Sequence, residues 1–232
     1  MAAESTYLNT GIYTVSEAAR LTRVSASRIR RWLRGYRYSS RKKKRYSSPP
    51  LWNGQFEAID NKLALGFLDL IEVKFVDAFL EAGVSWDMIH KARERAQKWF
   101  PGESHPFCRK KFVTDGREIL LELLKETGEP GLVEIANNQQ VFLEIMQPFI
   151  KELEFDKDDI LERWWPWGRE HKIAVDPKRN FGQPTVFREG VPTRILARSV
   201  KANGSSSEVA RWYEISREAV REAVKFEQEL AE

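Results

Sequence analysis

The sequence has few side chains suited to catalysis or metal binding. Its 232 residues include one cysteine and three histidines, namely Cys108, His90, His105 and His171. The histidines are scattered, and none has a metal-ligand spacing to Cys108 or to paired carboxylates. A glycine-rich phosphate loop, a G-x-S-x-G motif and an H-E-x-x-H motif are also missing. We therefore expect no enzymatic activity, no bound metal and no cofactor.

Long apolar runs are missing as well. No stretch approaches the roughly 18 apolar residues of a membrane span, and residues 1–11 contain no apolar signal-peptide core. A single cysteine excludes an internal disulfide and fits a reducing compartment. We expect a cytoplasmic protein that does not contact a membrane.

Acidic residues are scarce at the N-terminal end. Residues 1–50 contain twelve lysines and arginines but two acidic residues, Glu4 and Glu17, which gives this segment a formal charge of +10. Because the whole chain has a charge of +4, the remaining 182 residues have −6. This asymmetry predicts that the N-terminal region binds a polyanion and that the rest has a different task.

Two short helices with a tight joint are predicted near the N-terminus. Thr14 and Glu17 have the spacing of a capping box, which begins a helix that continues to about Thr22. Ser25 caps a second helix, and Gly35 ends it. The buried stripe of this second helix is predicted at Ile29, Trp32 and Leu33. The pattern is typical of a helix-turn-helix, whose second helix enters the DNA major groove.

The exposed face of the second helix is predicted to be basic, and no acidic residue lies within four positions of it. Guanidinium groups suit phosphate oxygens and the O6/N7 edge of guanine. Residues 36–50 follow with six cations, no acid and strand-forming tyrosines, which predicts a basic β-hairpin wing against the phosphate backbone. The candidate DNA-binding residues are Ser27, Arg28, Arg30, Arg31, Arg34, Arg37, Arg41, Lys42, Lys43, Lys44 and Arg45.

Two more helices are expected after the wing. One occupies Leu63 to Glu81, and the other is capped by Ser85 and ended by Pro101. The order of these elements over residues 12–100 resembles the winged DNA-binding domain of MerR-type regulators. The resemblance rests on Tyr13-Thr14-Val15-Ser16-Glu17-Ala18-Ala19, on Arg30-Arg31-Trp32 and on Ala82-Gly83-Val84-Ser85 through Ile89.

Residues 101–170 are predicted to form a connecting region. Asp115-Gly116 lies between β-prone residues, which predicts a short hairpin at Phe112–Leu120. A helix is expected from about Gln140 to Lys151. A cluster of tryptophans follows, which we interpret either as core packing or as anchors for a partner protein. These tryptophans are Trp164, Trp165 and Trp167.

Residues 171–232 are predicted to form a small domain of three helices, capped by Thr193, Ser205 and Ser216. The pattern I-x-V-D-P, F-G-x-P, G-V-P-T, A-R-W-Y-x-I-S resembles a small helical domain of VapB-like antitoxins, formerly of unknown function. The second and third helices could suggest another DNA-binding unit. We expect the glutamates on them to repel phosphates, and these are Glu208, Glu214, Glu218, Glu222, Glu227 and Glu229.

A MerR-like winged module joined to this domain resembles one subgroup of VapB-like antitoxins. The resemblance implies the antitoxin of a type II toxin–antitoxin system, which neutralises a PIN-like ribonuclease toxin and represses its own operon by binding operator DNA. It also implies toxin contacts in the C-terminal region. The candidates are Trp164, Trp165, Trp167, Arg188, Arg194, Arg198, Arg211 and Trp212.

An alternative is a free-standing MerR-type regulator without a toxin partner, although Pro101 interrupts the long dimerisation helix of such proteins. Since one helix-turn-helix contacts a half-site, we expect a homodimer or a toxin–antitoxin hetero-oligomer. The predicted fold is mainly α with short β-hairpins. Its parts are a MerR-like winged helix-turn-helix at 1–100, the connecting region at 101–170 and a small three-helix domain at 171–232.

Overall fold

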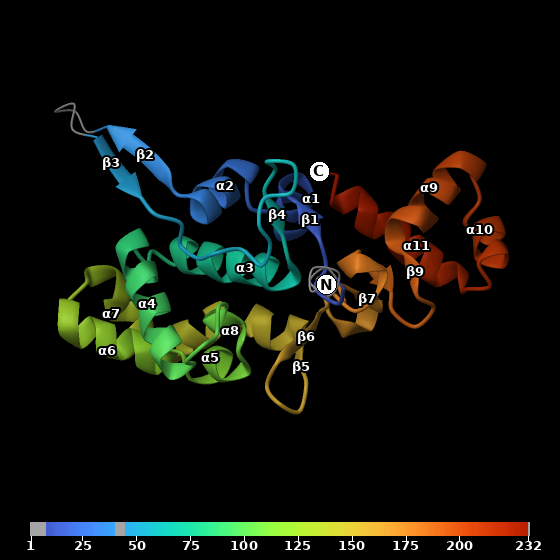
Figure 1. Ribbon diagram of the computed structural model, residues 1–232. Coiled ribbons are helices and arrows are strands. Elements are labelled where there is room, and N and C mark those ends of the chain that lie inside the picture. The colour runs from blue at the N-terminus through green and yellow to red at the C-terminus, as the bar shows by residue number, and fades with distance from the viewer. Residues whose placement is uncertain (1–7, 40–44, 232) are drawn as a thin grey trace. The chain divides into compact units, whose positions relative to one another are not determined.

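The computed structural model describes residues 8–39 and 45–231. They form two compact units, one from Tyr13 to Ile150 and one that combines the residues before Tyr13 with those from Lys151 onward. Helices with short antiparallel strand pairs make up both units (Figure 1), which confirms the predicted fold class. None of the helices in the described part is long and apolar enough to cross a membrane.

The predicted helix-turn-helix is present at the start of the first unit. Its elements are β1 (Tyr13–Thr14), α1 (Val15–Thr22) and α2 (Ala26–Arg34). The capping box is confirmed, because Thr14 Oγ1 accepts from the Glu17 amide at 3.2 Å and the Glu17 carboxylate accepts from the Thr14 amide at 2.9 Å. Ser25 caps α2, and the left-handed Arg23, with φ of 61°, turns the chain between the helices.

The wing follows α2 directly and extends away from it (Figure 1). It consists of β2 (Tyr36–Ser39) and β3 (Arg45–Ser48), paired antiparallel with Tyr36 opposite Ser48. The chain continues through β4 (Ala64–Leu65), α3 (Phe67–Glu81) and α4 (Trp86–Trp99). The helix expected from Leu63 therefore begins at Phe67, since Ala64 and Leu65 pair with β1 instead.

The hairpin predicted at Phe112–Leu120 is wrong. These residues belong to two helices that meet at Gly116. Helical backbone lets both helices bury apolar side chains, namely Phe112, Val113, Ile119 and Leu120. The Phe112 ring lies 5.9 Å from that of Phe75 on α3, and this packing overrides the turn preference of Asp115-Gly116. The helix predicted from Gln140 to Lys151 is confirmed. The elements of this region are η1 (Pro106–Cys108), α5 (Lys110–Asp115), α6 (Arg117–Thr127), α7 (Pro130–Asn137) and α8 (Gln139–Glu152).

The second unit contains two small sheets and three helices. The sheets comprise β5 (Leu153–Phe155) with β6 (Leu161–Trp164), and β7 (Ile173–Ala174), β8 (Thr185–Val186) and β9 (Val191–Pro192). Short 3-10 turns, η2 (Arg169–His171) and η3 (Asn180–Gly182), lie between strands. The predicted three-helix domain is α9 (Thr193–Asn203), α10 (Ser206–Trp212) and α11 (Arg217–Glu229). Its core is Val186, Leu196, Val209, Ala210, Val220 and Ala223.

Two of the three predicted caps of this domain are confirmed. The Ser205 and Ser216 hydroxyls accept hydrogen bonds from backbone N–H groups in the first turns of α10 and α11. Thr193 does not cap α9, because Pro192 occupies the N-cap position. The Thr193 hydroxyl donates instead to Glu227 Oε1 at 2.6 Å, which joins α9 to α11.

A buried carboxylate organises the first unit. Asp69, near the start of α3, is fully buried and accepts hydrogen bonds from Trp52 Nε1 at 2.8 Å, from the Gln55 amide at 2.9 Å and from the Gly66 amide at 2.8 Å. Nε2 of His105 lies 2.8 Å from its Oδ1. These partners come from the loop after the wing, the start of α3 and the segment after α4. One side chain therefore fixes three segments of the chain.

Glu72, also on α3, is buried without full compensation. Its Oε1 accepts from the Phe107 amide at 3.0 Å, whereas Oε2 has no hydrogen-bond partner within the described residues. Burial raises the pKa of Glu72 from 4.5 to about 7, although the charges of His105 and Arg93 lower it. The fold therefore favours the protonated acid.

This pKa shift predicts that stability falls with rising pH. Because the folded pKa lies above the unfolded value, the contribution of Glu72 is complete below pH 4.5 and is lost as the pH rises to about 7. Glu72→Gln stays neutral, so we expect it to raise the free energy of unfolding at pH 8 by about 2–3 kcal/mol. Urea unfolding at pH 5 and pH 8, followed by tryptophan fluorescence, measures this. The control is Glu118→Gln at an exposed position of α6, which should match the stability of the wild type at both pH values. A Glu72→Gln variant no more stable than wild type at pH 8 would contradict the assignment.

Candidate nucleic-acid interface

Four of the predicted DNA-binding residues share the exposed face of α2. Ser27, Arg30, Arg31 and Arg34 are exposed at the i, i+3, i+4, i+7 spacing of one helix face. The Arg31 guanidinium lies 4.8 Å from the Tyr36 ring centre, and Arg34 donates to the Asn61 carbonyl at 3.1 Å. These contacts leave donor groups of both arginines facing solvent. The face therefore presents several guanidinium groups side by side.

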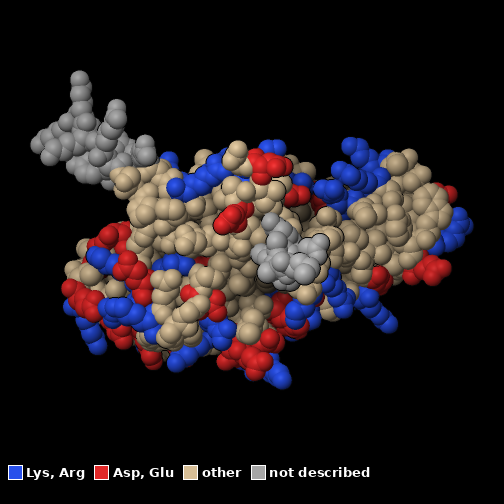
Figure 2. Space-filling view, viewed as in Figure 1, with Lys and Arg blue, Asp and Glu red and all other residues tan. Residues whose placement is uncertain are grey.

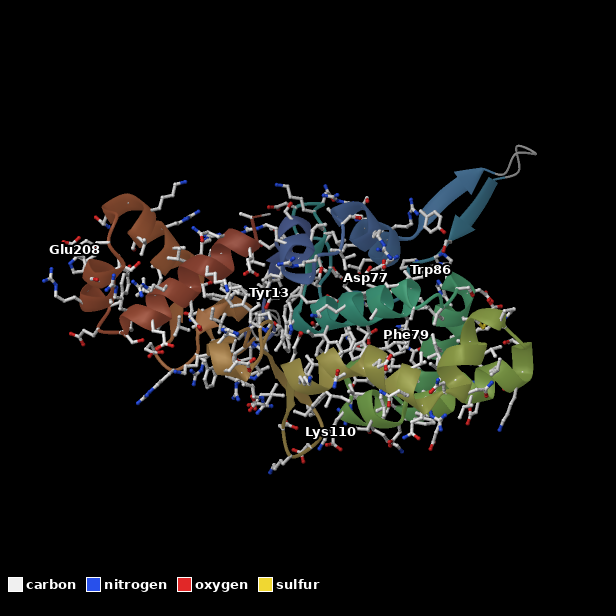
Figure 3. All side chains as sticks on the ribbon, turned by 180° about the vertical axis from the view of Figure 1, so that it is seen from behind. Tyr13, Asp77, Phe79, Trp86, Lys110 and Glu208 are labelled. Atoms are coloured by element: carbon white, nitrogen blue, oxygen red, sulfur yellow. The ribbon has the colours of Figure 1, made fainter. Side chains whose placement is uncertain are left out.

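Arg28 has a different environment from the other arginines of α2. Its Nη1 lies 2.8 Å from Asp77 Oδ1, which is labelled in Figure 3, and 3.6 Å from Glu81 Oε1, both on α3. Its guanidinium also lies 5.1 Å from the ring centre of Trp32. Desolvation raises the pKa of Asp77, and the charge of Arg28 opposes that rise. The pair connects α2 to α3, so Arg28 serves first to position the helix.

The wing adds further basic residues to the same unit. Arg37 lies opposite Ser47, and Arg45 lies opposite Ser39 in the hairpin register. The other predicted wing residues, Arg41, Lys42, Lys43 and Lys44, lie outside the described residues. The hairpin begins at Tyr36, directly after the C-terminal end of α2. A basic helix face and a basic hairpin are therefore adjacent in one unit.

The direction of the wing depends on a close backbone contact at Gly35. This residue has φ of +68°, and a Cβ there would lie 2.3 Å from the Ser48 carbonyl oxygen and 2.9 Å from the Pro49 carbonyl carbon. The Leu51 amide donates to the Trp32 carbonyl at 2.7 Å, which satisfies one of the last carbonyls of α2. The chain that leaves the wing is thus held tightly against the end of α2.

The tryptophans proposed as toxin contacts have different environments. Trp164 and Trp165 are 1% and 7% exposed, and their indole N–H groups donate at 2.8 Å to Glu152 and Glu154. Trp167 is half-buried, and its ring lies 5.1 Å from that of Phe226. Trp212, at the end of α10, is 53% exposed. Packing explains the first two, whereas Trp212 is accessible to a partner.

The arginines proposed with them are all exposed. Arg194 and Arg198 lie one turn apart on α9, with the exposed Ile195 beside them. The hydroxyl oxygens of Ser199 and Tyr213 are 3.3 Å apart, so this face of α9 adjoins the end of α10. Lys and Arg atoms gather near α9 on the face that Figure 2 shows. The α9 surface is defined here as Arg194, Ile195, Arg198, Trp212 and Tyr213.

Among residues 8–39 and 45–231, no group of three or more His, Cys, Asp or Glu side chains could hold a metal ion. Cys108 is buried, and burial raises the pKa of its thiol well above 9.0, which disfavours the nucleophilic thiolate. His105 contacts Asp69 in the core rather than in an open cleft. Sequence spacing gave no indication of this His105–Asp69 contact.

Comparisons with known proteins agree with this description. Residues 11–92 match the family described as "putative DNA-binding HTH domain", and residues 173–226 match DUF433, a protein of unknown function. Over 222 residues the chain is 23% identical to the "putative antitoxin VapB45" of Mycobacterium tuberculosis strain H37Rv, which covers 92% of both chains. None of these three descriptions names an enzyme. The predicted resemblance to VapB-like antitoxins with a helix-turn-helix is confirmed.

A solved structure has the same fold. The crystal structure of Rv2018 from Mycobacterium tuberculosis matches with a TM-score of 0.72 and 21% identity, over 94% of this chain and 99% of that chain. The arrangement of helices and short strand pairs is therefore shared over nearly the whole length of both proteins.

The contact at Gly35 predicts a variant that displaces the wing. We expect Gly35→Ala to displace the wing and weaken binding to promoter DNA at least tenfold. The control is Gly83→Ala, where φ is also positive, +87°, but nothing lies within 4 Å of the added Cβ. Gly83→Ala should lose about 1–2 kcal/mol of stability, the strain of a positive φ. Gly35→Ala should lose more, because its ψ of −180° lies in a region that only glycine readily adopts and its Cβ meets backbone atoms. Gel-shift titration combined with urea unfolding measures both effects. Equal DNA affinities for the two variants would show that the close contact does not set the wing.

Proposed function

We propose that this protein is an antitoxin that binds and neutralises a PIN-like ribonuclease toxin and represses its own operon by binding promoter DNA. The observation that supports DNA binding most directly is the exposed row of Ser27, Arg30, Arg31 and Arg34 on α2, next to the basic wing. Similarity to a protein named as a putative antitoxin supports toxin neutralisation.

In the proposed complex, α2 enters the major groove as in other helix-turn-helix proteins. Arg30 and Arg31 then face base edges, where each could form two hydrogen bonds with guanine O6 and N7. The MerR-type wing, from Arg37 to Arg45, contacts phosphates, which adds affinity without sequence preference. The repressor acts as a homodimer or a toxin–antitoxin hetero-oligomer, since one unit contacts one half-site.

Toxin neutralisation is assigned to the α9 surface. PIN-like active sites are pockets of carboxylates that hold divalent metal, so a guanidinium inserted there would pair with the carboxylates in place of the metal. Arg194 and Arg198 are exposed and one turn apart on α9. Trp212 is exposed at the end of α10, next in sequence to Tyr213, which contacts Ser199 of α9, and it offers a rigid apolar contact. Arg188 and Arg211 are exposed but are not part of this defined surface. The basic and aromatic character of the surface thus suits an acidic pocket.

The division of labour in DNA binding can be tested with two sets of substitutions. Replacing Arg41, Lys42, Lys43, Lys44 and Arg45 with alanine should weaken binding to all DNA sequences alike and flatten a salt dependence whose log–log slope is about −5 or steeper. Arg30→Ala should instead relax the preference for particular base pairs, at about 1–3 kcal/mol for a bidentate contact. Gel shifts on specific and random DNA at several salt concentrations measure both. Two identical, sequence-independent effects would refute this division.

Neutralisation can be tested on the full chain co-expressed with the product of the adjacent gene. Trp212→Ala should weaken toxin binding at least tenfold, because exposed aromatic anchors contribute about 2 kcal/mol or more at interfaces. Phe181→Ala is the control, since Phe181 is 63% exposed in the same unit but lies in η3, outside the α9 surface. Co-purification and growth rescue provide the measurements. If both variants bind and rescue as wild type does, the α9 surface is not the toxin contact.

A further inference from the structure

The joint between α10 and α11 repeats the joint between α1 and α2. The chain turns between the helices at a non-glycine residue in the left-handed region, Arg23 with φ of 61° in the first pair and Glu214 with φ of 55° in the second. In both pairs the second residue after this turn is a serine, Ser25 or Ser216, whose side chain caps the next helix. The two joints thus share a left-handed residue and a serine cap at the same spacing.

The buried residues around the two joints also have equal spacing. Val24 follows Arg23 directly, and Ile29 and Trp32 are buried six and nine residues after it. The second pair has Ile215 directly after Glu214, packed on the core, and Val220 and Ala223 buried at the same intervals. Five residues before each turn lies a fully buried small residue, Ala18 or Val209. This spacing is that of a helix-turn-helix, with α11 in the position of α2.

The outer face of α11 has basic side chains, two of them at positions equivalent to arginines of α2, whereas the position of Arg31 is taken by Glu222. Arg217, Arg221 and Lys225 are exposed at i, i+4, i+8 intervals, which aligns them along the helix. Counted along the chain from the left-handed residue, Arg221 and Lys225 occupy the same positions as Arg30 and Arg34. Within the part of the chain that the structure describes, Arg217 and Arg221 form no ion pair. The charges of these two arginines are therefore available to a ligand. Lys225 lies 5.4 Å from the Trp167 ring centre and 4.0 Å from Glu229 Oε1, so its charge is partly offset.

The glutamates of this domain oppose DNA binding less than their number indicates. Glu222 lies 3.2 Å from His171 Nδ1, and Glu227 accepts the Thr193 hydroxyl hydrogen bond at 2.6 Å. Both carboxylates thus contact groups of their own unit. Glu208 lies on α10 (Figure 3), away from the basic row in the sequence.

Two glutamates remain exposed next to the basic row, Glu214 in the turn and Glu218 at the start of α11. Glu218 occupies the position of Ser27 in the first pair, relative to the left-handed residue. A carboxylate at a groove-facing position accepts from the N4 amino group of cytosine and disfavours the other bases. It therefore lowers affinity for general DNA while increasing selectivity.

We propose that α10 and α11 form a second helix-turn-helix that binds double-stranded DNA through Arg217, Arg221 and Lys225. Arg217 and Arg221 contact phosphates or guanine, and Glu218 restricts the sites to those with a cytosine at the facing position. This interface adds to the one on α2 and does not depend on it. It lies on α11, whereas the proposed toxin contact lies on α9 and the end of α10.

The test compares two double variants of the full chain that lose equal charge from the same domain. Arg217→Ala/Arg221→Ala removes the basic row of α11, and Arg194→Ala/Arg198→Ala removes that of α9. The probe is the promoter region upstream of its own gene. The α11 variant should bind at least tenfold more weakly, with a salt slope reduced in magnitude by about 2, and should protect a shorter stretch of DNA from nuclease. The α9 variant should bind DNA as wild type does.

Further measurements separate this proposal from the proposed function. Arg30→Ala/Arg31→Ala tests the α2 interface on the same probe, and its failure to weaken binding would overturn DNA recognition by α2 instead. An α11 variant that keeps its melting temperature, the wild-type affinity and the protected length would overturn the second interface. Loss of toxin binding by that variant with unchanged DNA affinity would also overturn it and assign α11 to protein contact. Arg217→Lys/Arg221→Lys should recover most of the affinity if the contacts are to phosphates.

Discussion

The carboxylate of Asp69 is the contact on which the N-terminal unit depends. It accepts hydrogen bonds from Trp52, Gln55 and Gly66 in a site from which water is excluded. Removal of a buried charged acceptor leaves its donors unsatisfied, at about 1–3 kcal/mol each. Trp52 adjoins Leu51, whose amide binds the last turn of α2. The position of α2 therefore depends on a side chain in the core of the unit.

The charges around α2 act in two layers. Beneath the helix, Asp77 and Glu81 hold Arg28 against α3 and Trp32. On the outer face, Arg30, Arg31 and Arg34 have no carboxylate within ion-pair distance among the described residues, so their attraction for phosphates is not cancelled. If all the arginines of α2 were paired with acids, the helix would be well anchored but nearly neutral toward DNA. Separation of the two layers allows the helix to be both anchored and basic.

Local features of the sequence predicted most of this fold. Side-chain caps at Thr14, Ser25, Ser205 and Ser216, together with the spacing of apolar residues, determine helix starts within a few residues of chain. The hairpin expected at Phe112–Leu120 failed because the aromatic packing of Phe112 against Phe75 and Phe107 joins distant segments. The pairing of Arg28 with Asp77 could not be predicted either, because Asp77 lies on α3, far from Arg28 in the sequence. In both of these cases, an interaction between residues far apart in the sequence determines the structure.

The two helix-turn-helix units reach the same joint by different means of support. The unit of α2 has a polar core, in which the Asp69 carboxylate accepts several hydrogen bonds and burial raises the pKa of Glu72. α11 relies on an apolar cluster formed with α9 and α10, in which Leu196, Val209 and Val220 are fully buried. Burial of each such side chain stabilises the fold by about 1.5–3 kcal/mol and does not vary with pH. Rising pH therefore destabilises the core around Glu72 on α3, whereas the apolar cluster beneath α11 contributes the same free energy at every pH.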